Sequence, residues 1–261
     1  MSGIDGAGPL RIRVGTLNCR NTADRWQARK PLLVRQLVSL QPDVIGLQEL
    51  RRFPSQARAI AARARAGDLV LDQYRSYKTG LYGLWEGIAV LSRLPVLDRA
   101  KLRLGGQNRV VQRVTVAAGD GILEFYNTHL ASEGEEVRTR QAQRLLEWMA
   151  ERSSRPQVLV GDFNARPTAP SIQLLAGQLR SAHAVVHGEE PAKTVPTPLR
   201  VGVTGKGSVL DFIFVNPLVE VHEAWRTFEE SDAADEHLVA SDHYGLAATI
   251  SVRPTVQIHA G

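Results

Sequence analysis

The chain has 261 residues, of which 43% are hydrophobic and 23% charged, and a formal net charge of +5. This composition excludes a fibrous or intrinsically disordered chain, and the length suits one large α/β domain or two small ones. Cys19 is the only cysteine, which excludes an intrachain disulfide bond and a zinc site built from cysteines. The positive charge permits an acidic partner such as a phosphate ester or nucleic acid, but the arginines are spread along the sequence rather than clustered.

The N-terminal segment, residues 1–9, is rich in glycine and lacks the apolar stretch of a signal peptide. No apolar run approaches the roughly 18 residues that cross a bilayer, so we expect no membrane span. We expect a cytoplasmic, monomeric enzyme in which residues 1–9 and 253–261 form flexible ends.

The first predicted element is a strand over residues 10–18, in which apolar and polar side chains alternate. Asn18 then lies on the inward face at the end of this strand, and Cys19 points the opposite way. We therefore interpret Cys19 as a packed structural thiol and not as a nucleophile.

Helices and strands alternate in the next part of the chain. Leucines at helical spacing predict a helix over 29–40 that ends before Pro42, and the apolar residues 43–49 predict a second buried strand. Residues 54–66 are rich in alanine and arginine and predict a solvated helix, and residues 87–92 predict another buried strand.

Three strands follow at about 96–104, 109–117 and 121–128, and the glycine-rich turns between them favour antiparallel neighbours. A long amphipathic helix is predicted from about Glu133 to Arg152, with an acidic start and a basic end that suit the helix dipole. The remaining elements are a buried strand over 158–160, a helix near 169–180, a turn-rich loop over about 188–208, strands at 210–215 and about 218–228, an acidic loop over 229–236 and a final strand over about 245–252.

No internal repeat and no linker-like composition divides the chain. Strands outnumber helices, and they occur both in hairpin groups and in strand–helix–strand order. We therefore predict a single domain over residues 1–261, of the α/β class, with two packed sheets that carry helices on their outer faces.

Several of the predicted apolar strands end in polar side chains. Each has an ordinary explanation when taken alone: Asp162 and Asn164 favour a turn, and a single histidine at a strand end is usually a core or surface residue. Together, converging carboxylates would repel one another unless a cation lay among them, and hard oxygen ligands suit Mg²⁺ or Mn²⁺. Histidines and carboxamides complete the parts of metal-assisted phosphoryl chemistry. The set consists of Asn18, Glu49, His129, Asp162, Asn164, Asp211, Asp242 and His243.

These residues lie in a series of short motifs, which are Thr16-Leu17-Asn18, Leu47-Gln48-Glu49, the segment from Gly87 to Arg93, Asn127-Thr128-His129-Leu130, Gly161-Asp162-Phe163-Asn164, Leu210-Asp211-Phe212-Ile213 and Ser241-Asp242-His243. In their order and spacing, from about Arg11 to Val252, the chain resembles the endonuclease/exonuclease/phosphatase superfamily of deoxyribonuclease I-like, metal-dependent phosphoesterases. The resemblance implies a four-layer α/β/β/α sandwich with two mixed β-sheets.

The resemblance also implies a metal shell and a place for water. Glu49 would be the principal ligand of Mg²⁺ or Mn²⁺, with Asn18 and Asp242 completing or steering that shell. Asp162 and Asn164 would orient the attacking water and hold the phosphate.

The two histidines complete the site that the resemblance implies. His243, oriented by Asp211, would act as a base or as a donor to the phosphate. His129 would contact the scissile phosphate, and Glu86 lies where deoxyribonuclease I-like members place a glutamate that pairs with this histidine. Arg113 is a further candidate for binding the phosphate, although an arginine on a strand face is more often solvated.

The function that follows is a metal-dependent hydrolase that cleaves a phosphoester, in the first place a phosphodiester, by water attack. The substrate is left open among nucleic acid, nucleotide, lipid and sugar phosphate. One alternative is a Mg²⁺-dependent nuclease on DNA or RNA, which an acidic loop beside the site disfavours. Another is a non-catalytic module that binds phosphorylated ligands, which the completeness of the polar set disfavours.

Overall fold

The computed structural model describes residues 10–78, 85–202 and 205–252. The ends predicted to be flexible, 1–9 and 253–261, lie outside the described residues. No helix in these described ranges is long and apolar enough to cross a membrane.

The first sheet contains six strands, and it is mixed because β1 and β2 run parallel while the other neighbours are antiparallel. In spatial order its strands are β11 (Val219–Thr227), β14 (Gly245–Val252), β1 (Arg11–Asn18), β2 (Val44–Leu50), β4 (Gly87–Ser92) and β3 (Asp72–Tyr77).

The second sheet also contains six strands, and it is mixed because β7 and β8 run parallel. In spatial order its strands are β5 (Val96–Gly105), β6 (Arg109–Ala118), β7 (Gly121–His129), β8 (Gln157–Asp162), β10 (Asp211–Val215) and β9 (Arg180–Ser181).

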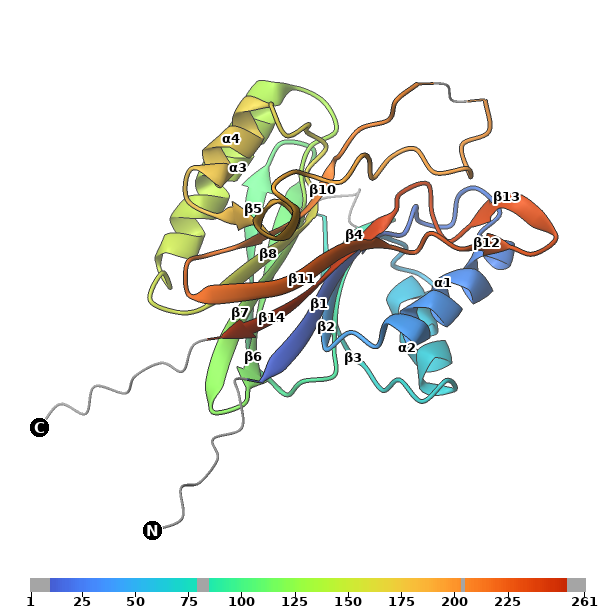
Figure 1. Ribbon diagram of the computed structural model, residues 1–261, viewed down its shortest axis with the longest axis horizontal. Coiled ribbons are helices and arrows are strands. Elements are labelled where there is room, and N and C mark those ends of the chain that lie inside the picture. The colour runs from blue at the N-terminus through green and yellow to red at the C-terminus, as the bar shows by residue number, and fades with distance from the viewer. Residues whose placement is uncertain (1–9, 79–84, 203–204, 253–261) are drawn as a thin grey trace, which may run out of the picture.

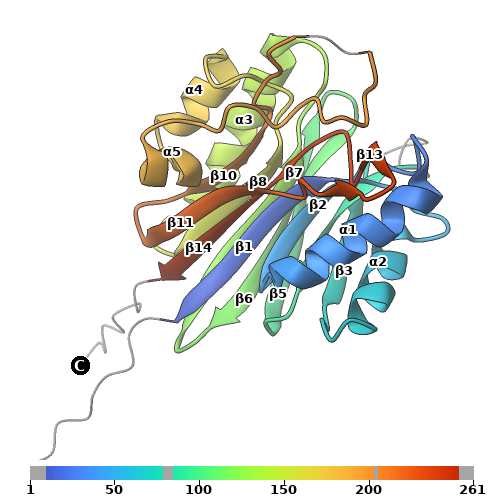
Figure 2. The ribbon, with the colours of Figure 1, turned by 45° about the vertical axis from the view of Figure 1, so that its right-hand side comes forward.

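The two sheets pack face to face, and helices cover their outer faces (Figures 1 and 2). Helices α1 (Trp26–Leu40) and α2 (Gln56–Arg65) bury leucines and alanines against the first sheet. Helices α3 (Glu135–Ala150) and α4 (Pro170–Ala176) do the same for the second sheet. A third apolar core, rich in valine, fills the space between the sheets. The predicted four-layer sandwich of two mixed sheets is therefore confirmed.

Several short elements differ from the sequence-based expectations. Strand β3 was not predicted, because its polar sequence lies at an edge of the first sheet and lacks an apolar alternation. Helix α5 (Ala182–His187) has only six residues and was not predicted. The helix predicted near 169–180 is shorter than expected, because α4 ends at Ala176. The acidic segment 229–236 is not a simple loop, since it contributes β12 (Ser231–Asp232) and the start of β13 (Asp235–Val239), which pair as a hairpin.

Strand direction brings the predicted polar residues together. The carboxyl ends of the parallel pairs β1–β2 and β7–β8 lie at the same end of the sandwich, where Asn18 of β1 reaches Asp162 of β8. Strands β4, β10 and β14 run antiparallel to these neighbours and therefore begin at this end. Residues at strand ends and strand starts thus meet at one edge of both sheets.

Candidate active site

A cavity of about 650 Å³ opens at this end of the two sheets. Its walls come from both sheets and from the turns that follow their strands, so folding of the whole sandwich is needed to form it. The lining residues are Arg20, Glu49, Lys78, Glu86, Gln107, Arg109, His129, Ser132, Asp162, Asn164 and His243.

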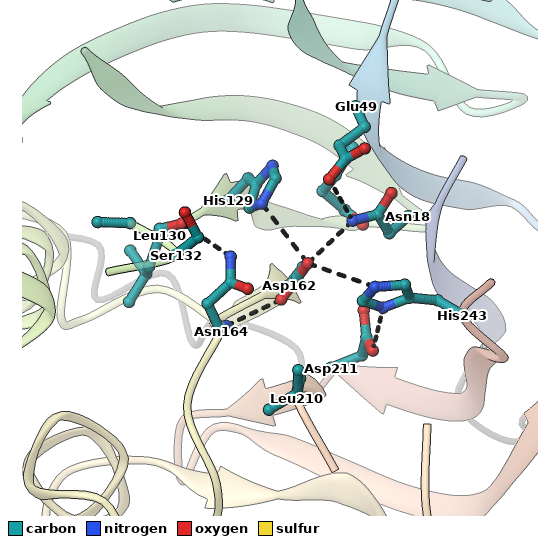
Figure 3. A network of polar contacts seen from close by, with 12 residues as sticks. Asn18, Glu49, His129, Leu130, Ser132, Asp162, Asn164, Leu210, Asp211 and His243 are labelled. Carbon is teal, nitrogen blue, oxygen red and sulfur yellow. Dashed lines mark hydrogen bonds and ion pairs between the residues drawn. The ribbon is translucent and has the colours of Figure 1, made fainter. Parts of the chain in front are cut away.

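Two carboxylates, the half-buried Glu49 from the first sheet and the buried Asp162 from the second, are joined by Asn18 (Figure 3). The Nδ2 group of Asn18 donates to Oε1 of Glu49 at 3.2 Å and to Oδ2 of Asp162 at 2.9 Å. Its Oδ1 accepts from the backbone N–H of Arg20 at 2.9 Å, which fixes the orientation of the amide. Asn18 therefore bridges the two carboxylates, and its oxygen would meet a metal only after the amide turned over.

The turns at these strand ends aim the carboxylates into the cavity. Glu49 has a φ of 51° and follows a register shift in β2, so its side chain leaves the regular alternation of the strand. Asn164 also has a left-handed φ, 50°, and its backbone N–H donates to Oδ1 of Asp162 at 2.8 Å. The side chain of Asn164 donates to the carbonyl of Leu130 at 3.1 Å, which ties this turn to the end of β7.

His243 lies between two aspartates of the second sheet. Its Nδ1 is 2.9 Å from Oδ2 of Asp211, and its Nε2 is 3.9 Å from Oδ2 of Asp162. Burial by itself disfavours the charged imidazole, but the two carboxylates outweigh it and raise the pKa of His243 to about 10. His243 is therefore an imidazolium at neutral pH in this arrangement, with Asp211 fixing its ring.

His129, in contrast, is neutral at pH 7. The Nη1 group of Arg109 lies 2.9 Å from its Nδ1, and its Nε2 lies 3.5 Å from Oδ2 of Asp162. Burial, the Arg109 guanidinium and the Lys78 ammonium hold the pKa of His129 well below its usual range. Since a guanidinium can only donate, Nδ1 is the acceptor and the proton resides on Nε2, which faces the buried aspartate.

Glu86 lies near His129, as the resemblance implies, but its closer contacts are with two basic side chains. Its Oε1 is 3.9 Å from Nδ1 of His129, while Lys78 approaches it at 2.5 Å and Arg109 at 3.3 Å. Glu86 therefore holds Lys78 and Arg109 in place at the cavity wall.

The sequence patterns predicted Arg113 as a phosphate contact and did not point to Arg109 or Lys78, which line the cavity. The structure does not bring Arg113 to the cavity: its guanidinium is buried, bonds Asp98 at 2.6 Å and lies over the ring of Trp148. The face of β6 that carries Arg113 is covered by α3. Arg109 begins β6 at the cavity end, and this strand-end position is the signal that could have identified it.

Asp242 lies next to His243 but turns towards two other cations. Its Oδ2 is 3.4 Å from Nε of Arg20 and 3.4 Å from Nη1 of Arg200. Asp242 does not line the cavity, and among the described residues it belongs to no cluster of side chains that could hold a metal ion. Two guanidinium groups already balance this carboxylate.

The donor set fits a hard divalent cation. The oxygen ligands would come from Glu49 and Asp162, since His243 is charged and the Nδ1 lone pair of His129 faces Arg109. The potential ligand atoms of Glu49, His129 and Asp162 lie within 4.8 Å of one another, as do those of Asp162, Asp211 and His243. Burial and the nearby Glu86 raise the pKa of Glu49, and burial raises the pKa of Asp162 to about 7. Carboxylates with such raised pKa values are the groups that a cation would stabilise in their charged form.

A model of the Endonuclease/Exonuclease/phosphatase family matches residues 15–243 of this chain. The protein belongs to this family. Among curated relatives it is 25% identical to the protein angel of Drosophila melanogaster over 267 residues, which cover 87% of this chain and 72% of angel. It is 26% identical to Nocturnin of Xenopus laevis over 264 residues, which cover 89% of this chain and 66% of that protein.

Solved structures share the fold of this family member at lower identity. The human Nocturnin catalytic domain with bound sulfate anion superposes with a TM-score of 0.76 and 22% identity, covering 94% of each chain. Danio rerio TDP2, complexed with single strand DNA product, gives a TM-score of 0.76 and 17% identity, covering 93% of this chain and 99% of that one. The superfamily resemblance read from the sequence motifs is thus confirmed.

Proposed function

We propose that this protein is a Mg²⁺- or Mn²⁺-dependent hydrolase of phosphoesters, in the first place of phosphodiesters. The observation that carries the proposal is that Glu49, Asp162, His129 and His243 converge on one cavity. Members of its family act as phosphoesterases and nucleases, in agreement with this chemistry. A module that only binds phosphorylated ligands would not need all of these groups.

Glu49 and Asp162 would hold the cation, and Asn18 would steer them through the hydrogen bonds that join all three. When bound, the cation supplies positive charge that polarises a phosphoryl oxygen. We propose that Asp242 forms ion pairs with Arg20 and Arg200 and does not bind the cation, because both guanidinium groups already contact its carboxylate.

The protein's own residues would handle the water and the phosphate. Asp162 would orient a water molecule, and Asn164 would fix that carboxylate through its backbone N–H. His243, charged and held by Asp211, would donate to an oxygen that gains negative charge. His129 would present its Nε2–H to the phosphate from the opposite wall of the cavity.

Nuclease activity on DNA or RNA is a second, sharper candidate. The observation that favours it is the basic wall of the cavity, where Arg20, Lys78 and Arg109 lie beside the carboxylates. The related TDP2 structure contains a single strand DNA product. Nucleotides, lipids and sugar phosphates are the other substrate classes. We further propose a single domain over residues 1–261 that acts as a monomer in the cytoplasm.

The test is hydrolysis of a small phosphodiester with Mg²⁺, with Mn²⁺ and with EDTA. We expect turnover with either metal, loss of turnover in EDTA, and a fall of at least about 10²-fold in kcat for His243→Ala and Asp162→Ala. His183→Ala is a matched control, because this histidine lies on α5 away from the cavity.

Unchanged turnover in either site variant, or full activity in EDTA, would refute the assignment. Intact plasmid, single-stranded DNA and RNA after incubation with both metals would remove the nuclease candidate while leaving the phosphoesterase proposal in place.

A further inference from the structure

Edge strand β5 carries three basic side chains at alternate positions, Arg99, Lys101 and Arg103, and all three are exposed. Their cross-strand partners on β6 are, in order, Val114, Gln112 and Val110. Val114 belongs to the core between the two sheets, so this face of β5 is the continuation of the sheet's inner face. The opposite face of β5 packs Leu102 and Leu104 beneath α3.

The inner face of β5 is uncovered because the first sheet ends at β3, its own edge strand. Figure 2 shows β3 and β5 at the same side of the sandwich. Between them lies a hollow of about 220 Å³, lined in part by Tyr74 and Ser76 of β3, Lys101 of β5 and Gln112 of β6. Gln112 is only 3% exposed, and its Oε1 has no hydrogen-bond partner in the described part of the protein. A polar hollow therefore opens where a sandwich normally has apolar contacts.

The basic row leads to the catalytic cavity. Strand β5 turns directly into β6, and Gly105 pairs there with Arg109, which lines the cavity and contacts His129. Gln107, in the turn between the strands, also lines the cavity. An extended ligand that reached out of the cavity past Arg109 would therefore contact Arg103, then Lys101, then Arg99.

Charged residues on an edge strand also discourage pairing with other chains, and such residues need no ligand. Three features of the basic row on β5 are not explained by protection of an edge strand. The row has one sign of charge, no ion pair engages its members among the residues that the structure describes, and the adjoining hollow contains a buried amide with a free acceptor. Alternate residues on a strand are about 6.8 Å apart, comparable to neighbouring phosphates in an extended polynucleotide.

We propose that Arg99, Lys101 and Arg103 bind the phosphate backbone of a single-stranded nucleic acid whose scissile phosphate lies in the catalytic cavity. The proposal deepens the proposed function and rests on it for cleavage, but not for binding. Arg99, Lys101 and Arg103 would position a long substrate from outside the catalytic cavity, and we call them the β5 track. Substrates too short to reach β5 would not contact these residues.

The experiment measures binding of fluorescein-labelled single-stranded DNA of about 20 nucleotides by anisotropy in EDTA, where cleavage is not required. The variant is the triple change Arg99→Gln, Lys101→Gln and Arg103→Gln. The matched control carries the same charge change on the exposed face of α2, at Arg58, Arg63 and Arg65.

We expect the β5 variant to bind at least about tenfold more weakly at low salt, with the slope of log affinity against log salt reduced by about 2. The α2 control should bind like the natural sequence, and both variants should hydrolyse a small phosphodiester at the natural rate. If both variants lost DNA affinity equally, or if the β5 variant lost none, the proposed binding of nucleic acid by the β5 track would be refuted. If the natural protein cleaves no phosphoester yet the β5 variant loses binding selectively, the proposed function fails and the track stands.

Discussion

Replacement of Asn127 by alanine tests how the two sheets are held in register beneath the cavity. This fully buried side chain accepts from Nε2 of Gln48 at 2.7 Å and donates to the carbonyls of Leu47 at 3.2 Å and Ala89 at 2.9 Å. It therefore connects β7 of one sheet to β2 and β4 of the other. Gly46 permits the close approach, because a Cβ there would lie 2.8 Å from the Asn127 amide.

The expected cost follows from these contacts. Three buried hydrogen bonds at about 1 kcal/mol each, with partners left unsatisfied in the core, predict a loss of about 3 kcal/mol or more in the free energy of unfolding. For a chain of this size the midpoint of thermal unfolding should fall by roughly 6–12 °C. Since Leu47 and Asn127 each lie two residues from a site residue, activity should also fall in protein that remains folded.

Urea unfolding followed by circular dichroism measures the loss. Ser132→Ala is a control at an exposed position of the cavity rim. A loss below about 1 kcal/mol for Asn127→Ala would refute the idea that this amide joins the sheets.

Three further outcomes follow from the structure. Burial raises the pKa of the Cys19 thiol to about 12, so the thiol stays protonated at pH 8, and a thiol reagent should modify it only after denaturant is added. Fast labelling of the folded protein would contradict that burial. Gly161→Ala should prevent stable folding, because the new Cβ would collide with a backbone carbonyl of β7, whereas Gly177→Ala should be tolerated at an ordinary φ of −68°; soluble expression and thermal unfolding compare the two. Arg109→Met should raise the pKa of His129, since burial and this cation both oppose its protonation, and NMR titration of the metal-free protein would show no shift if the contact were absent.

The positions of the principal site residues could be predicted from the sequence for a simple reason. A strand buried on both faces is apolar along its length, so a carboxylate, amide or histidine at or next to its last residue stands out, as it does at Glu49, His129 and Asp162. The family resemblance then supplied the expected partners, and the structure brings these side chains to one cavity. The long helices and core strands were predictable for the same reason, since their apolar periods are unambiguous.

Short polar elements were not predictable in this way. Strand β3 and the β12–β13 hairpin are held by pairing with neighbours and not by an apolar pattern of their own. The choice between Arg113 and Arg109 is of the same kind. Both are arginines of β6 on the same face of the strand, and only the contacts of Arg113 with Trp148 of α3 and with Asp98 show that it is a structural residue.

The sequence by itself therefore determined the fold class, the family and the identity of most polar groups at the strand ends, because these depend on local periodicity and on motifs. Only the tertiary structure decided the charge states of His129 and His243, the pairing of Asp242 with two arginines, and the uncovered basic face of β5. The physical reason is that electrostatic environment and surface exposure depend on which elements pack together, and residues far apart in the chain set both.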